Sequence, residues 1–193
     1  MDEMQKQALV FQRCFPGSVC LRTDHQLLVD VSGRKPVFFA QPPYEKIIVP
    51  QSGEWFLVSD CLVKAGLGLA DLIPYRVSSM PGKTFYLGFY SSFRMRAVHM
   101  QGLQRWMKGR QSATGTELLQ QMTESVRQCV LEALYEILGN KEKDYAQILA
   151  QREKLEKAIA GKLFRFLFYQ GLCMQNGSYQ IERIAKPMIR IDE

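Results

Sequence analysis

The chain has 193 residues, of which 47% are hydrophobic and 23% charged, a balance typical of a globular protein with a buried core. It contains no apolar run of about 18 residues or more, the length that a membrane-spanning helix requires. Its first residues, MDEMQKQALVFQRCF, lack the positive start and the long apolar segment of a signal peptide. We therefore expect a cytoplasmic protein.

Cysteine and histidine are too few and too scattered to indicate a metal centre or a disulfide framework. The number of cysteines is odd, and no two of them form a CxxC pair. With only His25 and His99 beside them, a tetrahedral zinc site has little support. We expect a reduced protein without metal or cofactor, whose thiols are Cys14, Cys20, Cys61, Cys129 and Cys173.

The first third of the chain has the pattern of short strands separated by turns. Apolar or alternating segments recur there, with PG, SG, GRKP, QPP and QSG between them. We interpret residues 64–83 as a connecting loop with turns at Pro74 and Pro81–Gly82, because Gly66-Leu67-Gly68 lacks the frame of a nucleotide-binding loop. The segments predict an antiparallel sheet, with strands at residues 8–14, 18–23, 26–32, 35–40, 45–50 and 54–60.

The segment FYLGFYSSFRMRA, residues 85–97, alternates along its whole length. One parity is apolar and consists of Phe85, Leu87, Phe89, Phe93 and Met95. The other parity is aromatic and basic and consists of Tyr86, Tyr90, Ser92, Arg94 and Arg96. Because successive side chains of a strand point to opposite faces, the pattern predicts a long strand with one apolar face. The second face is either a binding surface or a covered one, and we favour tyrosines packed under the helices that follow.

Three helices are predicted after this strand. A short basic helix has its apolar residues between Met100 and Met107 and ends at Gly109. The sequence from Thr114 to Glu117 has the form of a capping box, and the helix it opens continues to about residue 138, before Gly139. A second long helix begins after Asp144 and ends at Gly171. Its apolar positions are Tyr145, Ile148, Leu149, Leu155, Ile159, Leu163, Phe166 and Leu167, and its mixed-charge outer face is formed by Arg152, Glu153, Lys154, Glu156 and Lys157.

The segment GLCMQNGSYQIERI returns to strand character, with Asn176–Gly177 either a hairpin turn or a kink in one strand. The order of elements predicts an α+β fold: a mainly antiparallel sheet with two amphipathic helices packed on one face. We place a strand-rich N-terminal part at residues 1–53, the α+β core at 54–185 and a C-terminal tail at 186–193.

No pattern in the sequence assigns catalysis. Neither His25 nor His99 lies in a recognisable motif, and a nucleophile would need one of them as its base. The carboxylate pairs Glu142/Asp144 and Glu153/Glu156 lie among lysines, where they remain ordinary acids. We therefore expect a protein that is not an enzyme and has no catalytic residue.

The positive charge of the chain is unevenly distributed. The net charge is +6, and residues 72–116 contain no acidic side chain. Such a region indicates either a surface facing phosphates or a solvated face balanced by acids from elsewhere in the chain. Its cations are Arg76, Lys83, Arg94, Arg96, Arg105, Lys108 and Arg110.

Two binding hypotheses follow from this region. In the first, Arg105, Trp106, Lys108 and Arg110 form a basic amphipathic helix that contacts an anionic membrane surface. In the second, Tyr86, Tyr90, Arg94 and Arg96 form a strand face that stacks single-stranded nucleic acid. The signatures of an RNA-recognition motif and of common DNA-binding modules are absent, so we regard nucleic acid as the less favoured partner.

Residues 54–184 resemble the SPFH family (stomatin, prohibitin and flotillin), especially its soluble bacterial branch called virion-core-like. That branch has an Ile-Pro-Tyr-like turn, a glycine-containing strand and a Tyr-Ser-Phe-Arg-like strand, which match Leu72-Ile73-Pro74-Tyr75, Thr84 to Gly88 and Tyr90-Ser91-Ser92-Phe93-Arg94. Its long helices are similar to LLQQMTESVRQCVLEALYEIL (118–138) and ILAQREKLEKAIAGKLF (148–164), and its YGL turn is similar to Tyr169-Gln170-Gly171-Leu172, which has one inserted residue.

The resemblance implies a scaffold protein that self-associates or recruits a protein partner near the inner face of a membrane. The membrane-inserting segment and the long coiled coil of many relatives are not seen in this sequence, so ring assembly is the implied property with the least support. Asn176-Gly177-Ser178 also interrupts the continuous last strand of the family.

Overall fold

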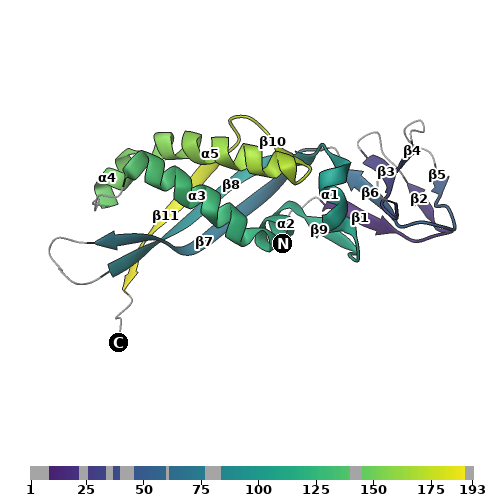
Figure 1. The fold of residues 1–193 in the computed structure, drawn as a ribbon, viewed down its shortest axis with the longest axis horizontal. Helices are drawn as coiled ribbons and strands as arrows, with labels where there is room; N and C mark the ends of the chain where they lie inside the picture. The colour runs from purple at the N-terminus through teal and green to yellow at the C-terminus, as the bar shows by residue number, and fades with distance from the viewer. Residues whose placement is uncertain are drawn as a thin grey trace, which may run out of the picture. The chain divides into compact units, whose positions relative to one another are not determined.

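The computed structural model describes residues 9–21, 26–33, 37–39, 46–59, 61–76, 84–139 and 145–189. It confirms the α+β class, with sheets whose described pairings are antiparallel. The strands are β1 (Leu9–Cys14), β2 (Val19–Leu21), β3 (Gln26–Asp30), β4 (Val37–Phe39), β5 (Lys46–Ile48), β6 (Trp55–Ser59), β7 (Val63–Arg76), β8 (Thr84–Ala97), β9 (Ser112–Thr114), β10 (Leu172–Met174) and β11 (Gln180–Ile189). The helices are α1 (Met100–Met107), α2 (Gly115–Gln121), α3 (Thr123–Leu138), α4 (Tyr145–Ala150) and α5 (Arg152–Tyr169) (Figure 1).

The chain divides into two compact units, and each unit is assembled from three separate stretches. The first unit comprises Met1–Ala65, Arg94–Leu118 and Leu167–Gln175. The second unit comprises Gly66–Phe93, Leu119–Phe166 and Asn176–Glu193. Strands β7 and β8 therefore each contribute residues to both units.

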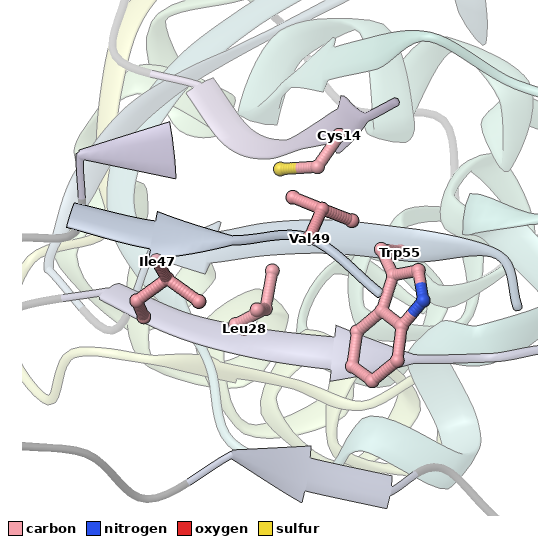
Figure 2. Close-up of a cluster of buried hydrophobic side chains, with 5 residues drawn as sticks. All are labelled: Cys14, Leu28, Ile47, Val49 and Trp55. Atoms are coloured by element: carbon pink, nitrogen blue, oxygen red, sulfur yellow. The ribbon is translucent and has the colours of Figure 1, made fainter. Parts of the chain in front are cut away.

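The first unit contains a five-stranded sheet in the order β4-β3-β6-β1-β9 and a separate ladder of β2 with β5. A buried apolar cluster packs residues of the ladder segment against residues of the sheet, as Figure 2 shows. Trp55 is anchored in it, because its indole N–H donates to the Ser52 carbonyl at 2.7 Å. The cluster consists of Cys14, Leu28, Ile47, Val49 and Trp55.

The second unit packs α3 and α5 with the sheet strands β7, β8 and β11. The Lys162 Nζ of α5 lies 3.7 Å from Oε2 of Glu132 and 3.2 Å from Oε2 of Glu136, both in α3. The two helices are therefore neighbours (Figure 1). The fully buried side chains of these helices and of the β8 apolar parity form the core of this unit, as the helical and strand periodicities predicted. They include Leu87, Phe89, Val126, Val130, Leu155, Ile159 and Leu163.

The outer edge of β11 is bonded by helix side chains. The Ile181 N–H donates to Glu156 at 2.9 Å, and Arg152 donates to the Ile181 carbonyl. The Tyr145 hydroxyl donates to the Ile184 carbonyl at 2.9 Å. These bonds satisfy backbone groups that an edge strand otherwise leaves open to another chain. Arg152 and Glu156 belong to the predicted mixed-charge outer face of α5, and these bonds give them a structural role.

The prediction of a connecting loop at residues 64–83 is wrong, because β7 occupies Val63–Arg76. Buried Val63, Ala65, Leu67 and Leu69 alternate with side chains on the other face, as a strand requires. Among the described strands, β7 pairs with β8 alone, and such an edge strand tolerates Pro74. The predicted turn at 81–82 lies outside the described residues.

Both predicted long helices are interrupted. The first breaks at Met122, which has φ −99° and ψ 14° and separates α2 from α3, while the Thr123 hydroxyl bonds back to the Gln120 carbonyl. The second breaks at Gln151, between α4 and α5. Leu149 is exposed rather than part of the apolar stripe, and the Asp144 cap lies outside the described residues.

The last part of the chain forms two strands, β10 and β11, with a kink between them. β10 and β11 both pair antiparallel with β8, through Cys173↔Arg96 and Ile184↔Phe89, so Asn176–Gly177 is not the turn of a hairpin. β11 continues to Ile189, which pairs with Phe85, so strand structure extends into the segment that we had assigned to the tail.

Candidate binding surface

Helix α1 has a buried apolar face, and the cations at its C-terminal end are exposed. Met100, Leu103 and Met107 are buried, whereas Arg105 and Lys108 are exposed. Arg110 follows the helix and is half-buried. The spacing of the buried residues is that of an amphipathic helix, as predicted.

Trp106 is less available than its place in a membrane anchor would require. Its ring is half-buried, and the Arg105 guanidinium carbon lies 5.2 Å from the ring centroid, within the range of a cation–π contact. Its indole N–H is buried and, in the part of the chain that the structure describes, has no hydrogen-bond acceptor. The cations of α1 are therefore better placed than Trp106 to meet a partner.

Backbone and side-chain contacts fix α1 within the first unit. The Gln104 side-chain amide is buried and donates to the carbonyls of Val31 at 2.8 Å and Gly33 at 2.6 Å. His99 caps the helix, since its Nδ1 accepts the Gly102 N–H at 3.2 Å. A Cβ placed on Gly102 would lie 2.6 Å from the nitrogen of Gly171, so these two backbones pack directly against each other. None of these roles was predicted from the sequence.

One carboxylate lies close to the end of α1 and is itself engaged. Glu54 accepts the Gly109 N–H at 3.2 Å, and Arg13 lies 4.0 Å from the same oxygen.

Glu117 is held by Thr114, whose backbone N–H donates to it at 2.7 Å and whose hydroxyl donates at 2.9 Å. These two bonds lower the pKa of Glu117. The Glu117 N–H in turn donates to the Thr114 hydroxyl at 3.2 Å, which confirms the predicted capping box.

Most of the large apolar side chains that are exposed in the described residues belong to the first unit. Val19 and Ile48 are direct partners in the β2–β5 ladder and are 59% and 71% exposed. Phe168 and Tyr169 end α5 in an edge-to-face pair with ring centroids 6.5 Å apart. The first unit thus carries exposed apolar surface as well as exposed cations. The set is Leu9, Phe15, Val19, Ile48, Leu62, Val98, Phe168 and Tyr169.

The tyrosines of β8 are only partly covered, whereas we expected them to be packed away under the helices. Tyr86 and Tyr90 are half-buried, while Leu87, Phe89, Phe93 and Met95 of the opposite parity are fully buried. Exposed Arg183 of β11 pairs with Tyr90 and holds its guanidinium carbon 4.5 Å from the ring centroid. Cβ atoms added to Gly68 and Gly88 would approach the Tyr90 ring at 3.4 Å and 3.3 Å, so this ring lies over two glycines.

The four residues of the predicted nucleic-acid face lie along the single strand β8. Tyr86 and Tyr90 belong to the second unit, whereas exposed Arg94 and Arg96 belong to the first. A base could stack on the open side of Tyr90 only after Arg183 had moved, because the guanidinium occupies that position. The Arg183 contact was not evident from the sequence, since a register shift in β11 between Ile181 and Arg183 decides it.

The described residues hold no group of three or more His, Cys, Asp or Glu side chains placed to bind a metal ion. Burial raises the pKa of the Cys129 thiol and of the Tyr179 hydroxyl, which favours the protonated form of both groups. Within the same residues, no helix is both long enough and apolar enough to cross a membrane. A scan against protein-family models and a search of curated proteins find no match to this chain.

Proposed function

We propose that this chain is a non-enzymatic, SPFH-like scaffold that self-associates or recruits a protein partner at the cytoplasmic face of a membrane. Its first unit would contact anionic lipid through α1, with Arg105, Lys108 and Arg110 facing the headgroups. One observation carries the proposal: Arg105 and Lys108 are exposed in the same compact unit as most of the exposed large apolar side chains. Cations beside exposed apolar groups are the chemistry that an anionic lipid surface attracts.

The three cations contribute an electrostatic term to the free energy of binding to an anionic lipid surface. Each lysine or arginine near an anionic surface contributes about 1 kcal/mol, so three contribute about 3 kcal/mol. That energy corresponds to roughly a 100-fold change in affinity. Because mobile ions screen exposed charges beyond about 8 Å at physiological ionic strength, binding should weaken as salt is raised.

Co-sedimentation with vesicles tests the lipid contact. We expect the protein to bind vesicles that contain phosphatidylserine and not vesicles of phosphatidylcholine alone. The triple variant Arg105→Gln, Lys108→Gln, Arg110→Gln should lose most of this binding and keep its thermal stability, because surface charges contribute little to folding.

A matched control variant distinguishes the effect of these three cations from the effect of the total charge of the chain. Lys154, Lys157 and Arg165 are exposed on α5, and Lys154→Gln, Lys157→Gln, Arg165→Gln removes the same number of cations. This control should bind vesicles nearly as well as the natural sequence. Equal losses in the two triple variants, or no binding by the natural sequence, would contradict the lipid contact.

Light scattering tests self-association separately. A solution mass that exceeds the 22.2 kDa chain and rises with concentration supports the scaffold. A monomer at all concentrations, with and without vesicles, would leave recruitment of a protein partner as the only form of the proposal.

A further inference from the structure

Asn176 and Gly177 form an exposed turn between β10 and β11. Gly177 has φ +70°, and a Cβ added to it would meet no atom within 4 Å. In the part of the chain that is described, neither the Asn176 side chain nor the Gly177 N–H takes part in a hydrogen bond. Solvent therefore reaches both reactive groups of this dipeptide.

The residues on either side of this turn are held in place. The Gln175 N–H donates to the Arg94 carbonyl at 2.8 Å. Tyr179 is buried, and its ring lies 6.0 Å from that of Phe93. The turn is thus anchored at its ends, while its central amide groups remain uncommitted.

We propose that Asn176 is a site of spontaneous deamidation. The Gly177 nitrogen gives up its proton to water and attacks the Asn176 side-chain carbonyl carbon, forming a C–N bond and a five-membered succinimide. The side-chain nitrogen leaves as ammonia, with the proton supplied by water. Water then adds to one of the two ring carbonyls and opens the ring to aspartate or isoaspartate. No oxidant or reductant is needed.

Glycine is the residue that allows this attack. It has no Cβ to shield its nitrogen, and its backbone reaches conformations that other residues avoid. A hydrogen bond to that nitrogen would hold its proton and oppose the reaction, and the Gly177 N–H makes none among the described residues. The exposed and unbonded turn therefore leaves the reaction open in the folded state.

The products change this part of the chain in two ways. A neutral amide becomes a carboxylate, which lowers the net charge of +6 by one. Isoaspartate also adds a methylene group to the main chain between β10 and β11, which both pair with β8. Because deamidation is spontaneous, the modified form accumulates with the age of the protein at the connection between β10 and β11.

The experiment incubates the folded protein at neutral pH and follows its tryptic peptides by mass spectrometry, with enzymatic methylation to detect isoaspartate. Asn140, which precedes Lys141, is the other asparagine of the chain and serves as an internal control. We expect Asn176 to convert faster than Asn140 by roughly an order of magnitude, because lysine shields its nitrogen and glycine does not. Equal rates at the two asparagines would overturn the proposal.

Three further measurements distinguish the effect of the folded turn from the effect of the Asn-Gly sequence itself. If the turn is permissive, the Asn176 rate in the folded protein should be within a few-fold of its rate in denaturant, and strong protection by folding would refute the proposal. The Asn176→Gln variant should remain a single species on ion exchange during incubation. Gly177→Ala should slow conversion in denaturant as well, where the strain of a positive φ plays no part.

Discussion

The contact between Gly102 and Gly171 makes a strong prediction about the stability of the first unit. Replacing Gly102 by alanine would place a Cβ 2.6 Å from the Gly171 nitrogen and 2.9 Å from the Gln170 carbonyl carbon. Both neighbours are backbone atoms, so no side-chain rotation can relieve the clash. Helix α1 would have to move away from the chain segment that follows α5.

Two opposing effects set the size of the change. Overpacking a well-packed site destabilises a protein by about 1–3 kcal/mol, and backbone neighbours place this site at the upper end. Alanine is favoured over glycine in a helix by about 1 kcal/mol. We therefore expect Gly102→Ala to lower the free energy of unfolding by about 2 kcal/mol, which corresponds to about 4–8 °C in Tm for a chain of this size.

Gly161→Ala provides the matched control, since it is also a helical glycine and a Cβ there meets nothing within 4 Å. Urea denaturation followed by circular dichroism should show Gly161→Ala to be as stable as the natural sequence or more stable. If Gly102→Ala matches Gly161→Ala, the close approach of the two backbones is refuted.

Three more predictions concern buried polar groups and one carboxylate. Gln104→Leu removes the donor to the Val31 and Gly33 carbonyls and should lower the stability by about 1–3 kcal/mol in urea denaturation, because it leaves the carbonyl of buried Val31 without this donor. Glu156→Ala leaves the buried Ile181 N–H without its acceptor, so hydrogen exchange at that amide should accelerate, while an amide of the other unit such as that of Val29 should not change. The depressed pKa of Glu117 means that its stabilisation is complete above the ordinary glutamate pKa and is lost as the pH falls through the folded-state value. Glu117→Gln should remove this acid-side decrease from thermal melts recorded across pH, and an unchanged pH profile would contradict the capping role.

Alternation and helical spacing were sufficient to predict most elements of this fold. The strand at 85–97 and the apolar stripes of the helices depend on which residues are apolar, and burial in the core is decided by the same property. The strand at Val63–Arg76 was missed because Gly66, Gly68 and Pro74 are typical of loops when they are considered singly. In the sheet, Gly68 instead leaves room for the Tyr90 ring, which no local pattern could indicate.

Of the candidate binding surface around α1, only the charged residues could be predicted from the sequence. The absence of acids in residues 72–116 drew attention to Arg105 and Lys108, and both are exposed. The half-burial of Trp106, the cap formed by His99 and the Gln104 amide bonds depend on residues far away in the sequence. Such long-range pairings are set by the tertiary structure and leave no periodic signal.

The interleaving of the two units has a consequence for synthesis. The first unit requires Leu167–Gln175 as well as the N-terminal sheet, and β10 pairs with β8 within it. A ribosome that has released the first 118 residues has therefore not yet supplied a complete folding unit. Because chains emerge at about 5–20 residues per second, β8 waits several seconds for the arrival of β10. During that interval the backbone groups of β8 that later bond to β10 are open to water or to another chain.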